Sequence, residues 1–298
     1  PAPQYGQRLL GLEARLGRRP SQRTEEFRAD GLMLPQQERL AGQDFVNVRK
    51  FRGRILDRLK HWVSPDDHSK GTYYAGLKRL QQDINFPLHV FSLNYDLCIE
   101  RLAGDDFRIE TGFEDFGPKF PWNWERFEER ENGPEPPQIY LYKLHGSINW
   151  KRDPKTKLLC CVEQTAGIEP ESMELIFGRE FKVEAADPYL FYLYAFRVAS
   201  LNARLIVSVG YGFGDIHINS LLAEALRSDP QRRILAVSQR CDDNGVSYLG
   251  KTRKALGIGS EEREQVQVYA KGAREFLLQD KLAAVLQDQI LANPAAPF

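Results

Sequence analysis

A histidine, an amide and a carboxylate stand directly after apolar runs of this sequence, where side chains often reach a ligand. His145 follows one such run and precedes Gly146. The ordinary pKa of a histidine, about 6.5, suits a general base near neutral pH. Asn94 and Asp96 follow another apolar run. A turn and a structural histidine are the simpler interpretations, but the three side chains in one cleft would favour acid–base chemistry.

A glycine-rich loop, Gly-Tyr-Gly-Phe-Gly-Asp over residues 210–215, separates an apolar run from a helical pattern. Glycines let a backbone approach a ligand closely, and a helix N-terminus offers free N–H groups to a phosphate. The spacing differs from the dinucleotide pattern GxGxxG. Asp215 is either an N-cap of the following helix or a partner for a sugar hydroxyl, because its carboxylate would repel a phosphate.

Five short apolar runs predict buried strands, and helical patterns separate several of them. The runs are Leu88–Leu93, Ile139–Leu144, Arg204–Val209, Arg233–Val237 and Val266–Ala270. The helical patterns are Leu97–Leu102, Pro188–Leu201 and Ile218–Leu226. Strands that alternate with helices indicate an α/β fold with a mostly parallel sheet and helices on both faces.

Ligands of open parallel sheets bind beyond the carboxyl ends of the strands. The residues that follow the five predicted strands are therefore expected to meet along one edge of the sheet. They are Ser92, Asn94 and Asp96, then His145, Gly146 and Ser147, then residues 210–215, then Ser238, and finally Gly272.

The first part of the chain predicts helices. An amphipathic stripe with spacings of three and four residues is expected to pack on the core, and a second helix repeats the pattern. The stripe is Phe45, Val48, Phe51, Ile55, Leu59 and Trp62, and the second set is Tyr73, Leu77, Leu80 and Ile84. We therefore divide the chain into a helical segment over residues 1–86, packed on the core, and an α/β domain over residues 87–298.

Charge is unevenly distributed, although 41 Lys+Arg balance 41 Asp+Glu. Residues 1–60 hold about thirteen basic and about seven acidic residues, which favours a solvated helical face or a docking surface for a partner or nucleic acid. Residues 105–137 hold about ten acidic and about four basic residues together with five prolines. We interpret them as a solvated insertion or lid with little regular structure.

The composition disfavours several classes of protein. A net charge of zero is unlike a strongly basic nucleic-acid-binding domain. No apolar run approaches the length of a membrane span, and the first residues have no signal-peptide character. Four cysteines without a CxxC pair favour reduced thiols in a cytoplasmic protein. The absence of GxSxG and GxxxxGK[ST] disfavours an α/β-hydrolase and a P-loop ATPase.

Three ordered motifs resemble the sirtuin family, and within it the NAD+-hydrolysing sirtuin-like proteins of bacterial antiphage defence. Residues 92–96 (SLNYD) are similar to the sirtuin pattern Thr-Gln-Asn-Ile-Asp, and residues 144–147 (LHGS) to the sirtuin His-Gly. The loop at 210–215 with the following IHIN resembles the corresponding loop of the defence proteins. The resemblance covers about residues 85–280.

This resemblance implies a Rossmann-like fold that binds NAD+ as its substrate, with chemistry at the nicotinamide ribose. Asn94 would position the attacking water or the ribose hydroxyls, and Asp96 would hold the nicotinamide carboxamide. His145 would act as the base. The residues that would line the nucleotide are Ser92, Gly146, Ser147, Gly210, Tyr211, Gly212, Gly214, Asp215, Ser238 and Gly272.

The sequence departs from the sirtuin pattern in two respects. Sirtuin deacylases carry two CxxC pairs after the His-Gly, whereas only Cys160 and Cys161 occur here, so we expect no zinc module and no metal. The family also opens with a strand and a Gly-Ala-Gly loop that contacts the NAD+ phosphates. This sequence does not contain that loop. We expect it to precede Pro1, unless the protein binds NAD+ without it.

The resemblance therefore implies an NAD+ glycohydrolase, which releases nicotinamide and ADP-ribose and acts in antiphage defence by depleting NAD+. One alternative is a catalytically inactive module that senses NAD+ or ADP-ribose. Another is a sirtuin-type protein deacylase or ADP-ribosyltransferase. The resemblance also implies a homo-oligomer or a complex with a sensing or nucleic-acid-handling subunit, and no membrane association.

Overall fold

The computed structural model describes residues 34–64, 68–131, 133, 135–165, 168–176, 186–239, 246–259 and 263–291. The chain divides into two compact units, Pro1–Ile55 and Leu56–Phe298. The boundary falls within helix α2 (Leu34–Val63). The second unit holds every described strand and all of the predicted site residues. Roughly half of the basic stretch, residues 1–33, lies outside the described residues.

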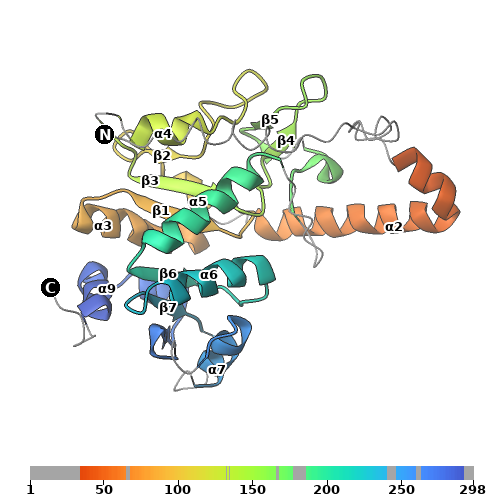
Figure 1. Ribbon diagram of the computed structural model, residues 1–298. Coiled ribbons are helices and arrows are strands. Elements are labelled where there is room, and N and C mark those ends of the chain that lie inside the picture. The colour runs from red at the N-terminus through yellow and green to blue at the C-terminus, as the bar shows by residue number, and fades with distance from the viewer. Residues whose placement is uncertain are drawn as a thin grey trace, which may run out of the picture. The chain divides into compact units, whose positions relative to one another are not determined.

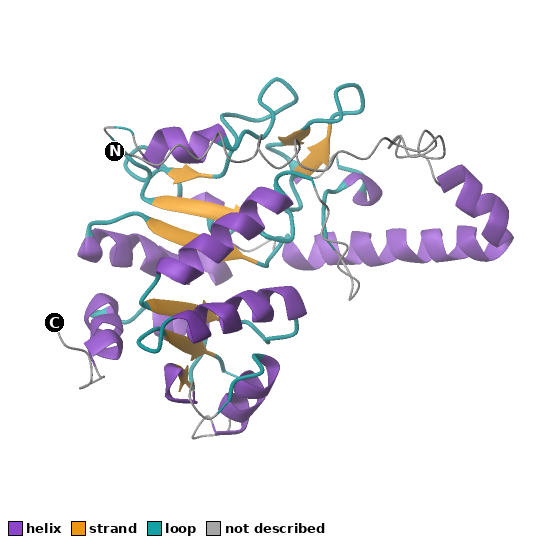
Figure 2. Ribbon diagram, in the orientation of Figure 1, coloured by secondary structure: helices purple, strands orange, loops and turns teal. Residues whose placement is uncertain are grey.

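Two three-stranded parallel sheets form the centre of the second unit (Figures 1 and 2). The first has the order β1-β3-β2, with β1 at Leu88–Ser92, β2 at Ile109–Glu110 and β3 at Ile139–Lys143. The second has the order β6-β7-β8, with β6 at Leu205–Val209, β7 at Arg233–Val237 and β8 at Val266–Tyr269. A short antiparallel pair joins β4 (Trp150–Arg152) to β5 (Leu159–Cys161).

The five predicted strands are confirmed to within one residue at each end. The fold is α/β, mostly parallel and Rossmann-like, as the sequence predicts. The expected single sheet is instead two hydrogen-bonded sheets, because β1 and β6 each pair on only one side among the described residues. The side chains of these edge strands are mostly part-exposed, whereas all five residues of β3 and of β7 are buried.

Helices cover both faces of the sheets. Helix α5 (Tyr189–Asn202) packs beside α6 (Ile216–Ser228), and α3 (Ala75–Ile84) contacts α8 (Ala273–Leu277) and α9 (Leu282–Leu291). The remaining described helices are α4 (Glu125–Glu131) and α7 (Val246–Ala255). The predicted helices at Pro188–Leu201 and Ile218–Leu226 are therefore confirmed as α5 and α6.

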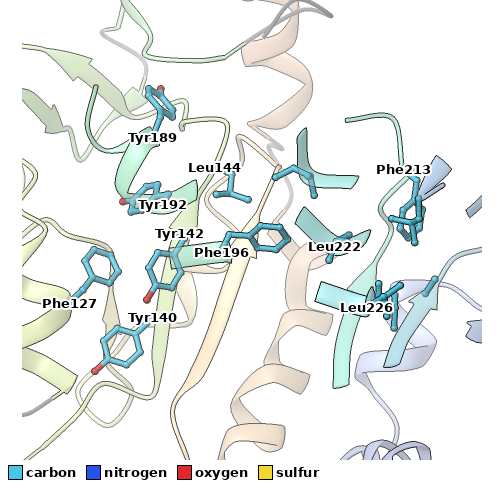
Figure 3. Packing of buried hydrophobic residues seen from close by; sticks show 14 of the residues in the cluster. Phe127, Tyr140, Tyr142, Leu144, Tyr189, Tyr192, Phe196, Phe213, Leu222 and Leu226 are labelled. Atoms are coloured by element: carbon cyan, nitrogen blue, oxygen red, sulfur yellow. The ribbon is translucent and has the colours of Figure 1, made fainter. Parts of the chain in front are cut away.

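Alternation along each strand explains this layering, because successive side chains point to opposite faces. In β1, Phe91 packs with Tyr142 of β3 and Phe196 of α5, in the cluster that Figure 3 shows. Val90 points to the other face and packs with Leu77 of α3. The same alternation in β6 and β7 buries one row of side chains against α6 and the other against α3, α8 and α9.

The predicted helix at Leu97–Leu102 is wrong. Only a single 3-10 turn, Glu100–Leu102, forms there. Ala103 is extended, and Gly104 and Phe107 exchange two backbone hydrogen bonds that close the segment into a tight loop. These two bonds satisfy backbone N–H and C=O groups that would otherwise be satisfied within a longer helix.

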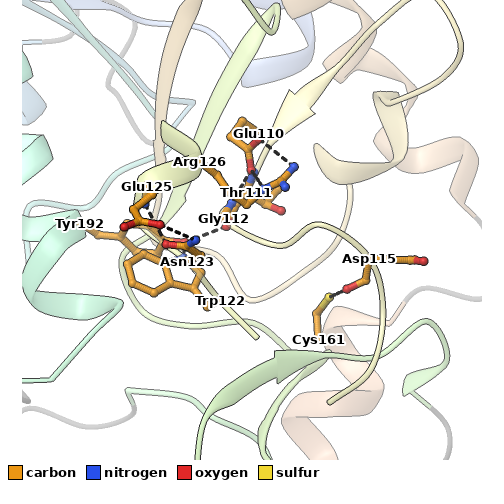
Figure 4. A network of polar contacts seen from close by, with 10 residues as sticks. All are labelled: Glu110, Thr111, Gly112, Asp115, Trp122, Asn123, Glu125, Arg126, Cys161 and Tyr192. Atoms are coloured by element: carbon orange, nitrogen blue, oxygen red, sulfur yellow. Dashed lines mark hydrogen bonds and ion pairs between the residues drawn. The ribbon is translucent and has the colours of Figure 1, made fainter. Parts of the chain in front are cut away.

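The predicted solvated insertion at 105–137 is also wrong in part, because its aromatic side chains are core residues. Phe107, Phe113 and Phe127 are buried, and the segment contributes β2 and α4. Figure 4 shows the network of polar contacts that holds this segment in place. The buried Glu110 carboxylate pairs with Arg126 and accepts the N–H groups of Thr111 and Gly112. The high charge of the segment thus lies around a packed interior.

The helical prediction for the start of the chain is confirmed over its described part, as α2, a 3-10 helix at His68–Tyr74 and α3. The stripe expected to pack on the core is only partly buried: Phe51 and Trp62 are exposed, while Leu59 is partly buried. Leu56, which lies outside the predicted stripe, is 2% exposed and packs with Ile148. The side chains of Phe45 and Val48 lie outside the described residues.

Candidate functional site

His145 and Asp215, which are 70 residues apart in sequence, form a direct side-chain contact. Nε2 of His145 lies 3.1 Å from Oδ2 of Asp215. His145 stands just beyond the end of β3, and Asp215 lies between β6 and α6. Both side chains retain some exposure, 15% for the imidazole and 8% for the carboxylate. A carboxylate that accepts from one ring nitrogen fixes the orientation and the tautomer of a histidine.

Asp215 is also the N-cap of α6. Its Oδ1 accepts the backbone N–H groups of His217 and Ile218, at 2.9 and 3.2 Å. Burial alone would raise the pKa of the Asp215 carboxyl, but the hydrogen bond from His145 and the two backbone N–H groups lower that pKa below its usual range. The N-cap interpretation is confirmed. Because the carboxylate occupies these donors, the α6 N-terminus is not a free phosphate site.

The turn after His145 is held by a neighbouring backbone segment. The N–H of Ile176 donates to the His145 carbonyl at 2.9 Å, and Tyr189 donates to the Glu174 carbonyl at 3.3 Å. Gly146 has a φ of 86°, and a Cβ on it would stand 2.1 Å from that same Glu174 oxygen. Only glycine fits there, so Gly146 allows close backbone packing, and its predicted contact with the nucleotide stays a prediction.

Ser147 likewise has a supporting role. Its side chain is fully buried, and its hydroxyl donates to the carbonyl of Tyr95 at 3.4 Å. The N–H of Ile148 donates to the same carbonyl at 3.1 Å. The two bonds join the loop after β3 to the loop after β1. The predicted contact of Ser147 with a nucleotide stays a prediction.

The loop after β1 carries Asn94 and Asp96 to this junction. The Tyr95 ring lies 6.5 Å from the His145 ring, and the Tyr95 hydroxyl donates to the Ile176 carbonyl at 2.6 Å. Asp96 accepts the N–H of Cys98 at 2.9 Å, which is the turn that the simpler interpretation predicts. The Asn94 side chain is exposed at the surface of the same loop. Ser92 is buried, and its hydroxyl accepts the Asn94 N–H.

Tyrosine hydroxyls hold the glycine-rich loop by hydrogen bonds, and no protein atom lies close to the side where its glycines would carry a Cβ. Tyr211 donates to the carbonyl of Asp215 and to the side chain of Asn219, and Tyr248 donates to the Tyr211 carbonyl. A Cβ added to Gly210, Gly212 or Gly214 would meet no atom within 4 Å, although the φ of 69° at Gly210 itself favours glycine. Since neither close packing nor a positive φ calls for glycine at 212 and 214, the space beside them suits a ligand.

Ser238 and Gly272 lie at the ends of the second sheet. Ser238 is buried directly after β7, and its N–H donates to Tyr269 of β8. Gly272 precedes α8, where its N–H donates to the Glu275 carboxylate at 3.2 Å. The contact of His145 with Asp215 and the bond of Ser147 to Tyr95 bring the first three predicted motifs together.

Sequence reasoning missed two features of the site. One is the segment at 174–176 that holds His145, for which the sequence offers no signal. The other is Lys143, which is only 3% exposed at the end of β3. The sequence does signal this feature, because a lysine inside the apolar run at 139–144 indicates a buried charge, and lysine is almost never fully buried unless it is paired.

The cysteines give no support to a nucleophile or a metal centre. Burial raises the pKa of the Cys161 thiol to about 12, so this thiol stays protonated near neutral pH. Cys241 lies outside the described residues. Within the described ranges, no three His, Cys, Asp or Glu side chains gather in a way that could hold a metal ion. None of the helices described is long and apolar enough to cross a membrane.

Comparison with protein families gives one match. Residues 88–258 match the model of a family described as the SIR2-like domain. That range includes Asn94, His145, Asp215 and Ser238, and it leaves Gly272 outside. A comparison with curated proteins finds no match.

Proposed function

The chain belongs to the SIR2-like domain family, and from this premise we propose that it is an NAD+ glycohydrolase. The family relation makes the chain a member of an NAD+-related enzyme group. The specific reaction is our proposal, and the observation that carries it is the contact between His145 and Asp215 beside the Asn94 loop. A base and an amide at one edge of a parallel sheet suit hydrolysis at a sugar carbon.

In the proposed reaction, the bond between C1′ of the nicotinamide ribose and the nicotinamide nitrogen breaks. The electron pair of that bond goes to the ring nitrogen, so the positively charged pyridinium leaves as neutral nicotinamide. Water attacks C1′, forms the new C–O bond and gives up a proton. The products are nicotinamide, ADP-ribose and a proton, and nothing is oxidised or reduced.

We assign the base to His145. When its Nε2–H donates to the Asp215 carboxylate, the neutral ring carries its lone pair on Nδ1. Nδ1 then takes the proton from water, and Asp215 stabilises the imidazolium that results. The Asp215 carboxylate is suited to this because its pKa is lowered, so it stays ionised near neutral pH.

Asn94 and the glycine loop would bind the substrate. The exposed Asn94 amide can both donate to and accept from a water or ribose hydroxyl. Gly212 and Gly214 leave room for the nucleotide backbone. Asp96 remains our candidate for the nicotinamide carboxamide, and Ser238 and Gly272 for the adenosine end. These assignments rest on the sequence resemblance and on the placement of each residue at a strand end.

The experiment that tests the proposal is incubation of the protein with NAD+, with nicotinamide and ADP-ribose measured separately by chromatography. Equal amounts of both products, abolished by His145→Ala, support hydrolysis. Binding of NAD+ without turnover, even in the assembled complex, would favour the sensor module instead. Release of nicotinamide only when a peptide is present, with ADP-ribose or an acyl group transferred, would favour a sirtuin-type transferase or deacylase.

The biological setting is part of the same proposal and rests on the resemblance alone. We propose depletion of NAD+ in the cytoplasm during antiphage defence. We also propose that a homo-oligomer, or a sensing or nucleic-acid-handling partner, switches the reaction on.

A further inference from the structure

Lys143 is a buried cation directly behind the candidate site. It is the last residue of β3, two residues before His145, and 3% of it is exposed. A buried lysine needs an opposite charge or hydrogen-bond acceptors to compensate for the water it has lost. Two described residues supply them. Nζ lies 3.4 Å from Oε1 of Glu100, and it donates to the backbone carbonyl of Asp96.

The two partners lie on the loop after β1. Asp96 precedes Glu100 by four residues, and Asn94 precedes Asp96 by two. Lys143 therefore ties the end of β3 to the segment that carries the exposed amide. The same segment also accepts the N–H of Cys98 at Asp96 and the N–H of Ile148 at Tyr95, and the Tyr95 hydroxyl donates to Ile176.

The ion pair between Lys143 and Glu100 is not expected to stabilise the fold. Removing two charges from water costs free energy that their attraction often fails to return, and apolar residues of similar volume frequently stabilise a protein as well. Oε2 of Glu100 is buried and has no hydrogen-bond partner among the described residues. Burial raises the pKa of Glu100, although Lys143 opposes that shift. A role in fixing the loop explains the pair better than a role in stability.

We propose that Lys143 is a positioning residue, which holds the Asp96 carbonyl and so keeps the loop that carries Asn94 in the geometry that the reaction needs. Glu100 supports this role by compensating the buried charge. The activity part of this inference rests on the proposed function, whereas the placement of the loop can be tested without it.

The test uses Lys143→Met, Glu100→Leu and the double variant that carries both. Lys143→Met removes the donor to Asp96 and leaves the partly buried Glu100 without its charged partner. The double variant replaces both charges by apolar side chains and is expected to regain the thermal stability that the single variants lose. Arg197→Met serves as the control, because it removes a cation from an ion pair with Glu224 that is nearly half exposed.

We expect kcat for nicotinamide release to fall on the order of 100-fold in Lys143→Met, because a small displacement of an orienting group has an effect of that size. KM is expected to change much less than kcat. The double variant should remain as slow as Lys143→Met even though its melting temperature recovers. A double variant that regains both stability and kcat would show that the pair is only structural and would overturn the proposal.

Hydrogen exchange supplies a readout that does not depend on turnover. The amides of Cys98 and Ile148 should exchange faster in Lys143→Met and in the double variant than in the parent and in Arg197→Met. Exchange as slow as in the parent would overturn the positioning role, whatever the activity. Faster exchange in Lys143→Met, with a parent that does not split NAD+ even in its oligomer or its partner complex, would refute the proposed function and leave the role of Lys143 in the loop supported.

Discussion

Oδ2 of Asp215 lies 3.1 Å from Nε2 of His145 and accepts its hydrogen bond, and the same Asp215 caps helix α6. One carboxylate thus joins the turn after β3 to the helix after β6. The two carboxylate oxygens have different partners. Oδ2 contacts the imidazole, and Oδ1 accepts hydrogen bonds from the backbone N–H groups of His217 and Ile218. The orientation of the candidate base is therefore set by a helix of the other sheet.

His145 is expected to be essential for turnover but not for folding. Loss of a general base costs on the order of 10²- to 10⁴-fold in rate. His145→Ala should lower kcat for nicotinamide release within that range and leave the melting temperature close to that of the parent, because the imidazole is partly exposed. Kinetics at saturating NAD+ and a thermal melt check this. Turnover at the parental rate would remove His145 from the mechanism.

Asp215→Asn separates the two roles of Asp215. Asparagine is as good an N-cap as aspartate, so α6 should keep its cap, whereas the charged partner of His145 is lost. Asp215→Ala loses both. We expect Asp215→Asn to be slow but stable near neutral pH, and Asp215→Ala to be slow and less stable by about 1 kcal/mol. Equal melting temperatures for the two variants would contradict the cap.

The lowered pKa of Asp215 predicts a pH dependence of stability. Because the folded-state pKa lies below the unfolded one, the ionised carboxylate stabilises the native state above the ordinary aspartate pKa of about 4. This contribution is lost as the pH falls below that value. The gap in melting temperature between the parent and Asp215→Ala should therefore shrink as the pH falls below about 4. A gap that widens as the pH falls below about 4 would show the opposite sign.

Gly212 and Gly214 test whether the open side of the loop takes a ligand. Alanine at either position meets no protein atom, so stability should stay the same or rise by about 0.4–1 kcal/mol. Affinity for NAD+, measured by calorimetry, should fall. Gly146→Ala is the matched control, since its Cβ would strike the Glu174 carbonyl and destabilise the fold. Unchanged affinity in both loop variants would place the nucleotide elsewhere.

The Glu110 network tests whether the segment at 105–137 is a structural part of the domain. Glu110→Ala breaks a mostly buried ion pair with Arg126 and removes the acceptor of two backbone N–H groups, which should cost about 3–5 kcal/mol. Glu110→Gln keeps an acceptor and should cost less. Denaturant unfolding measures both. The kcat of the folded fraction should stay near that of the parent, whereas a large fall in kcat without loss of stability would favour a lid.

The sequence by itself determined the strands and the helices α5 and α6, because their signals are local. Apolar runs and helical spacing arise from the side chains of one element and the two faces that it presents. The glycine loop and the strand-end placement of His145 follow in the same way. The failed helix at Leu97–Leu102 and the packed segment at 105–137 depended instead on partners elsewhere in the chain.

Only the tertiary structure decided what each site residue touches. The sequence offered Asp215 as a cap or a ligand contact, and the fold made it a cap and the partner of His145. It gave no sign that Gly146 packs against Glu174, whose carbonyl lies where a Cβ on Gly146 would stand. It gave Lys143 no role, and the loop after β1 supplies both of its partners. Contacts between segments tens of residues apart depend on how the sheets and helices pack. The periodicity of side chains along the sequence does not contain that information.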